Sequence, residues 1–87
     1  MFTAAQIKAL MDAHPFRPFR ICMSDGKTYD ITNHDMAFVG RNSVEVGRNL
    51  DAEGFAEYFA PCAIMHITRL EDLEDSSKTL SPSPSDR

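Results

Sequence analysis

The chain has 87 residues, enough for one domain with a small core, and a core of that size makes self-association a reasonable expectation. Its 43% hydrophobic and 25% charged residues exclude a wholly disordered chain, and no apolar run approaches the ~20 residues that span a bilayer. The formal charge of -4 disfavours a typical nucleic-acid-binding protein, because residues 1–70 hold eight acids and seven bases and lack a basic excess.

The first residues predict a short amphipathic helix. Thr3 and Gln6 have the spacing of a capping box. The apolar positions that would face a sheet are Phe2, Ile7, Leu10 and Met11. A helix of about ten residues is unstable alone, so we expect it to pack on a sheet. The start lacks a basic leader followed by an apolar core, which predicts a cytoplasmic protein.

The segment 14–32, HPFRPFRICMSDGKTYDIT, predicts a β-hairpin. Apolar residues alternate with polar ones on both sides of the Asp25-Gly26 turn, at Phe19, Ile21, Met23, Tyr29 and Ile31. Cys22 and Cys62 lie in predicted strands outside any CxxC pair, so we interpret both as buried reduced thiols.

Further strands are predicted at 36–39, 43–46 and 62–67. The assignment at 55–70 is ambiguous, because Phe55, Tyr58 and Phe59 have helical spacing and Pro61 interrupts either a helix or a strand. The fold class is therefore α+β: a short N-terminal helix packed on a four- to five-stranded antiparallel sheet. We expect a single domain over residues 1–71 and a disordered, acidic, Ser/Pro-rich tail over 72–87.

No catalytic, metal or cofactor motif stands out. The histidines His14, His34 and His66 have no metal-binding spacing, and phosphate-binding glycine motifs are absent from the sequence. We therefore expect a protein that is not an enzyme and that binds neither metal nor cofactor. A small hydrolase using Ser24, His34 and Asp35 stays as a further alternative, which requires those side chains to meet in space.

The sharpest candidate binding residues combine arginine and aromatic side chains: Phe16, Arg17, Arg20 and Arg41, with Arg48 and Arg69 as potential neighbours. Arginine beside exposed aromatic rings can grip phosphate and stack on bases. The competing interpretation, which we favour, places the phenylalanines in the core and pairs the arginines across strands with Asp30, Glu45 or Glu57.

The motifs PFRPFRICMSDGKTYDI, NSVEVG and MHITRLE resemble a family of short uncharacterised bacterial proteins with a PFRPFxIxxSDGRxFxI opening and a closing HITRIE-like strand. The likeness covers roughly residues 15 to 71 and implies a shared fold without an activity; Lys27 stands where arginine is usual. The order of a helix before a bent five-stranded sheet is also similar, more loosely, to Sm-like small β-barrels. No RNA-binding position of those barrels has a counterpart here.

These features predict a small non-catalytic protein-binding or regulatory module. We expect a protein partner, a homo-oligomer with a dimer favoured, and no membrane. Small acidic proteins of this build include phage-encoded inhibitors that occupy a host protein's nucleic-acid groove, which is one form that such regulation takes. The alternative is an Sm-like RNA-binding protein that uses Phe16, Arg17, Arg20 and Arg41.

Overall fold

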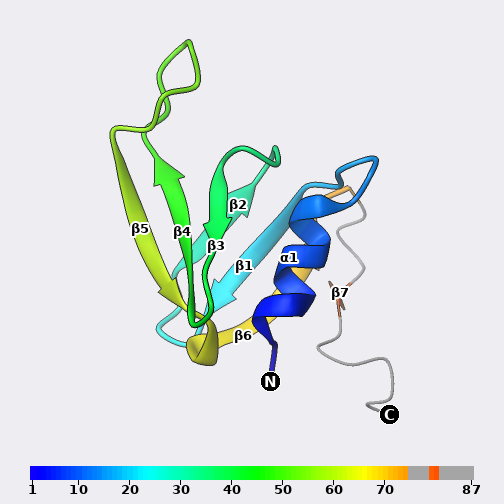
Figure 1. The fold of residues 1–87 in the computed structure, drawn as a ribbon. Helices are drawn as coiled ribbons and strands as arrows, with labels where there is room; N and C mark the ends of the chain where they lie inside the picture. The colour runs from blue at the N-terminus through cyan, green and yellow to red at the C-terminus, as the bar shows by residue number, and fades with distance from the viewer. Residues whose placement is uncertain (75–78, 81–87) are drawn as a thin grey trace.

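The computed structural model describes residues 1–74 and 79–80, which form one α-helix and two antiparallel sheets (Figure 1). One sheet has the strand order β2-β1-β6-β7 and the other has the order β3-β4-β5. The elements are α1 (Ala4–Asp12), β1 (Phe19–Met23), β2 (Thr28–Ile31), β3 (Ala37–Val39), β4 (Ser43–Arg48), β5 (Tyr58–Ala63), the 3-10 turn η1 (Ile64–His66), β6 (Ile67–Asp72) and β7 (Thr79–Leu80). Among these elements, no helix has the length and apolar character needed to cross a membrane.

The N-terminal helix begins as its sequence predicts. The Thr3 hydroxyl accepts a hydrogen bond from the Gln6 backbone N–H at 3.2 Å, and the Gln6 side-chain oxygen accepts one from the Thr3 N–H at 2.8 Å. Ile7 and Met11 are buried, and the helix contacts β3. The capping box sets the start of the helix, and the apolar stripe holds it against the sheet.

The predicted hairpin is present as β1 and β2, with Phe19 opposite Ile31 and Ile21 opposite Tyr29. Gly26 occupies the turn with φ +91°, a conformation that costs glycine little and other residues more. Its N–H donates to the Met23 carbonyl at 3.0 Å and closes the loop.

The region 55–70 departs from the predicted single strand at 62–67. Two strands, β5 and β6, meet there at η1, and β5 begins as early as Tyr58. Pro61 lies inside β5 and does not interrupt it, because β5 is the edge of its sheet. A strand at a sheet edge tolerates the missing proline N–H on its unpaired side.

The expected single sheet, and the barrel that it would have formed, are also corrected. The residues between β2 and β3 form a turn, in which the Met36 N–H donates to the Asn33 carbonyl at 3.2 Å. Among the described strands, β2 pairs only with β1 and β3 pairs only with β4. Strands of four and three residues are too short to continue from one sheet into the other, so the structure is not a closed barrel.

The boundary of the predicted tail is also different. Asp72 ends β6 and is 4% exposed, so the folded part extends past residue 71. Residues 79–80 form β7, which pairs with β6. The rest of the predicted disordered tail, residues 75–78 and 81–87, lies outside the described residues.

The core lies between the two sheets and the helix. Its buried side chains come from α1, from both sheets and from η1, which joins the sheets: Phe2, Ile7, Met11, Phe19, Ile21, Ile31, Ala37, Val44, Val46, Cys62, Ile64, Ile67 and Leu70. With both sheets facing this core, their other faces and the gap between their edges are left to contact solvent or a partner.

Candidate functional site

The arginines predicted to bind a ligand next to the hairpin are held by carboxylates. Arg17 Nη2 lies 2.6 Å from Asp72 Oδ2, and its Nη1 lies 3.3 Å from Glu74 Oε1. Arg20 Nε lies 2.7 Å from Asp30 Oδ1, and the hydrogen bond to Asp30 is the main cause that raises the pKa of Arg20. This cross-strand pair is of the kind that the sequence favoured, which named Asp30, Glu45 and Glu57 as partners for the arginines without assigning them.

The other two predicted binding residues lie elsewhere. Phe16 is half-buried and packs with its ring centroid 6.1 Å from that of Phe19. Arg41 lies in the turn between β3 and β4, beside a hollow that η1 also lines, whereas Arg17 lies at the far end of β6 from η1. Arg41 therefore lies apart from Phe16, Arg17 and Arg20, and the four residues do not form one surface.

The hydrolase alternative fails on geometry. His34 Nδ1 lies 3.2 Å from Asp35 Oδ1 in the turn after β2. Ser24 lies in the turn before β2, where its N–H donates to the His66 carbonyl at 2.8 Å. The whole of β2 separates the serine from the histidine and the aspartate, so these three side chains do not meet.

An exposed aromatic surface occupies the outer side of the β3-β4-β5 sheet. Phe38 of β3 is 64% exposed and Phe59 of β5 is 46% exposed, yet their ring centroids are only 5.9 Å apart. They lie on the two strands that flank β4, where Phe38 is opposite Glu45 and Phe59 is opposite Gly47. We call this surface, with Glu45 and Pro61 beside the rings, the aromatic face.

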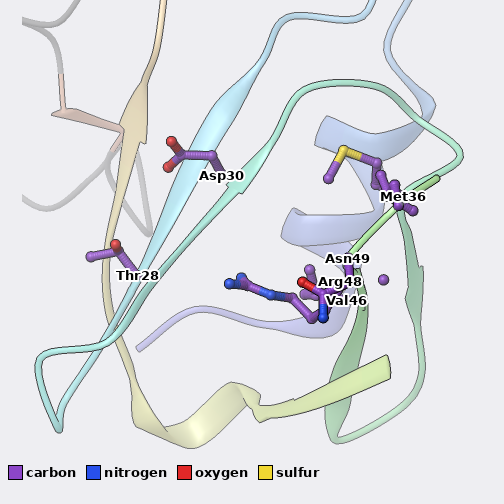
Figure 2. Close-up of a pocket in the computed structure, with 8 residues that line it drawn as sticks. Thr28, Asp30, Met36, Val46, Arg48 and Asn49 are labelled. Atoms are coloured by element: carbon purple, nitrogen blue, oxygen red, sulfur yellow. The ribbon is translucent and has the colours of Figure 1, made fainter. Parts of the chain in front are cut away.

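A second feature is a cleft between the two sheets, which we call the Tyr29–Arg48 cleft. The Arg48 guanidinium lies over the Tyr29 ring, with its carbon 5.0 Å from the ring centroid. Figure 2 shows the Arg48 side chain extending from the end of β4 toward β2, the strand that carries Thr28 and Asp30. Tyr58 pairs with Arg48 across β4 and β5 and lines the same cleft.

Two hollows make up this cleft, and Thr28 and Arg48 line both of them. The first has a volume of about 340 Å³ and is also lined by Asp30, Met36 and Asn49. The second has a volume of about 400 Å³ and contains Lys27, Tyr29, Tyr58 and Ala60. Both volumes are within the range of small-molecule sites.

The sequence offered only a partial signal for these two surfaces. Arg48 was noted as a potential neighbour of the hairpin arginines, but nothing local placed it over Tyr29. Tyr58 and Phe59 are consecutive large aromatic residues, and in a strand such a pair must place one ring on each face. That alternation is the signal, once β5 is recognised as a strand.

The fold and these two surfaces define a small α+β protein, with an exposed aromatic sheet face on one side and a cation- and tyrosine-lined cleft between its sheets. Comparison of the chain with protein-family models, with curated proteins and with solved structures finds no match.

Proposed function

We propose that this protein is a small non-catalytic protein-binding module that forms a homodimer through its aromatic face. The observation that carries the proposal is the contact between Phe38 and Phe59, two rings that remain about half or more exposed although they touch each other. Contiguous exposed apolar surface of this kind is typical of protein interfaces, and aromatic residues dominate their binding energy.

The charges at the two ends of the face favour a second copy as the occupant. Arg41 lies at the turn where β4 begins, and the loop after β4 carries three acids, Asp51, Glu53 and Glu57. Figure 1 shows that turn and that loop at opposite ends of β4. When two copies stack face to face with their β4 strands antiparallel, each Arg41 meets the acidic loop of the other copy.

Glu45 is the carboxylate on the aromatic face itself. It is half-buried, and its Oε2 accepts a hydrogen bond from the Ser43 hydroxyl at 3.2 Å. Glu45 is opposite Phe38, and Gly47 is opposite Phe59 on the other side of β4. The carboxylate therefore lies beside the rings, where its hydrogen bond to Ser43 partly satisfies it.

The test is the molecular mass by sedimentation equilibrium across a range of protein concentrations. We expect a dimer for the native chain and a dimer weakened by about tenfold or more in Phe59→Ser, because the interface loses a central aromatic ring. Tyr58→Ser is the matched control, since Tyr58 is the neighbouring residue on the opposite face of β5 and is similarly exposed, at 53%. A monomeric native chain, or equal losses in both variants, would overturn the proposal.

A charge exchange tests the antiparallel arrangement. Arg41→Glu alone should weaken the dimer, because it places acid against acid. Adding Glu53→Arg to Arg41→Glu should restore the dimer. The acid at position 41 of each copy then meets the arginine at position 53 of the other copy. Glu53 suits this exchange because Asp51 and Glu57 accept local hydrogen bonds, from Phe55 and Asn49 respectively. Failure of the double variant to recover would exclude this arrangement.

RNA binding through Phe16, Arg17, Arg20 and Arg41 has weaker support. Arg17 and Arg20 already lie within 2.6 and 2.7 Å of carboxylate oxygens, so gripping a phosphate would require breaking those ion pairs. Regulation of another protein, including inhibition of the phage type, stays a prediction that builds on the dimer.

A further inference from the structure

Among the lysines and arginines of residues 1–74, two of the three that form no ion pair with a described carboxylate line the same cleft. Within residues 1–74, four of the seven lysine and arginine side chains form ion pairs: Lys8, Arg17, Arg20 and Arg69. The other three in that range, Lys27, Arg41 and Arg48, have no ion pair with a described carboxylate. Lys27 and Arg48 line the same hollow of the Tyr29–Arg48 cleft, although the whole chain carries a formal charge of -4.

Asp30 is the one acid among the residues that line the two hollows, and it is paired with Arg20. Asp30 lines the first hollow, but both of its carboxylate oxygens accept hydrogen bonds from Arg20, at 2.7 and 3.3 Å. The negative charge of Asp30 is thus already compensated by Arg20, which lies on β1 and does not line the cleft. Lys27 and Arg48 are thus the charged side chains of the cleft that no lining carboxylate pairs with, and an anion can use them.

The remaining groups of the cleft are hydroxyls and aromatic rings. Thr28, Tyr29 and Tyr58 supply hydroxyl donors, and Tyr29 is already covered on one side by the Arg48 guanidinium. Tyr58 is 53% exposed, so its ring is open to a planar partner. An arginine stacked on a tyrosine is pre-positioned, which lowers the entropy lost when it binds a ligand.

We propose that the Tyr29–Arg48 cleft binds a nucleoside phosphate, either as a free nucleotide or as a unit of a single strand. Lys27 and Arg48 contact the phosphate, and the base stacks on Tyr58. Phosphate suits this pair of cations because arginine offers a planar fork of donors and lysine a point charge. A planar base suits the second half of the cleft because stacking on an aromatic ring tolerates any base. This inference does not rest on the proposed dimer, since the cleft and the aromatic face lie on opposite sides of β5.

The experiment is a titration of the full chain at low salt, followed by backbone amide NMR shifts, with adenosine monophosphate, uridine monophosphate, a uridine decanucleotide and inorganic phosphate as probes. We expect shifts at residues 27–30, 48 and 58–60. A decanucleotide that binds at least tenfold more tightly than the mononucleotides identifies a single strand as the ligand, with an affinity that falls as salt rises. Equal affinities identify the free nucleotide.

Matched variants separate the roles of the residues. Arg48→Ala should weaken nucleotide binding by about tenfold or more, and Arg48→Lys should recover only part of it because the planar fork is lost. Tyr58→Ala should weaken the binding of the nucleotides but not that of inorganic phosphate. Phe59→Ala, on the other face of β5, should leave nucleotide binding unchanged. If Arg48→Ala does not fold, Lys27→Ala and Tyr58→Ala, both at exposed side chains, carry the test.

Three results would overturn the proposal. The first is the absence of shifts at low salt with all four probes. The second is that inorganic phosphate binds as tightly as the nucleotides, which would show that the base contributes nothing to binding. The third is nucleotide binding that neither Arg48→Ala nor Tyr58→Ala weakens, because the ligand would then lie elsewhere. Loss of the dimer without loss of nucleotide binding would count only against the proposed function.

Discussion

Arg17 bridges the segment before β1 to the end of β6, where its Nη2 lies 2.6 Å from Oδ2 of Asp72. The Asp72 side chain is only 4% exposed, and its other oxygen, Oδ1, accepts a hydrogen bond from the Glu74 N–H at 2.9 Å. The Leu73 N–H also donates to the Pro18 carbonyl at 3.0 Å. Arg17 thus joins the segment before β1 to the last residue of β6, at one end of these two inner strands.

The first prediction is that Arg17→Ala destabilises the fold by about 1–2 kcal/mol. The substitution removes the Arg17 guanidinium from a buried carboxylate, and the half-exposed position of Arg17 reduces the cost below that of a fully buried pair. Urea unfolding at a fixed protein concentration measures it. Arg69→Ala, which removes the exposed partner of Glu71, is the control and should change stability by less than about 0.5 kcal/mol. Equal losses of stability in the two variants would mean that the Arg17–Asp72 ion pair stabilises the fold no more than an exposed pair does.

The second prediction concerns Gly47, which leaves room for the loop after β4 to pack close to the strand. A Cβ atom on Gly47 would lie 3.1 Å from the Ala56 Cβ and 3.2 Å from the Met36 carbonyl oxygen. Because the second of these is a backbone atom, Gly47→Ala should cost about 1–3 kcal/mol. Thermal unfolding measures the loss. Gly40→Ala, whose Cβ would lie 3.4 Å from the Ser43 carbonyl oxygen, should cost clearly less.

The third prediction is that Thr3→Ala lowers stability by about 1 kcal/mol, since the Gln6 N–H loses its acceptor at the first turn of α1. Helix content by circular dichroism and urea unfolding should fall together. Ser24→Ala, at an exposed position in the β1–β2 turn, serves as the hydroxyl-removing control. A silent Thr3→Ala would show that packing of Ile7 and Met11 alone fixes the start of the helix.

The fourth prediction is a loss of stability at alkaline pH that depends on Cys62. Burial is the main cause that raises the pKa of this thiol from 9.0 to about 11. Above pH 9 the unfolded chain releases the thiol proton while the folded chain keeps it, so the free energy of unfolding falls until the pH passes the folded pKa. At about pH 10 this amounts to at most about 1.4 kcal/mol.

The measurement compares urea unfolding of the native chain and of Cys62→Ala at neutral pH and at about pH 10. The variant starts less stable because a buried side chain is shortened. Its further loss on raising the pH should be smaller than that of the native chain, and the difference isolates the thiol from the tyrosines and lysines that both proteins share. Identical alkaline losses would contradict a raised thiol pKa.

The sequence by itself determined the elements whose signals are local. The capping box at Thr3 and Gln6, the alternation on both sides of Asp25-Gly26 and the pairing of Arg20 with Asp30 are set by residues a few positions apart along the chain. Turn chemistry and strand period act at that range, so these features follow from the sequence without knowledge of the rest of the fold.

Only the tertiary structure decided that Arg17 pairs with a buried carboxylate and that Arg48 lies over the Tyr29 ring. Asp72 lies 55 positions from Arg17 along the chain, and β2 and β4, which bring Tyr29 and Arg48 together, belong to different sheets. The same holds for Phe38 and Phe59, which meet because β3 and β5 both pair with β4. Charge compensation and exposure depend on which strands become neighbours, and that choice is made by burial of the shared core rather than by any local pattern.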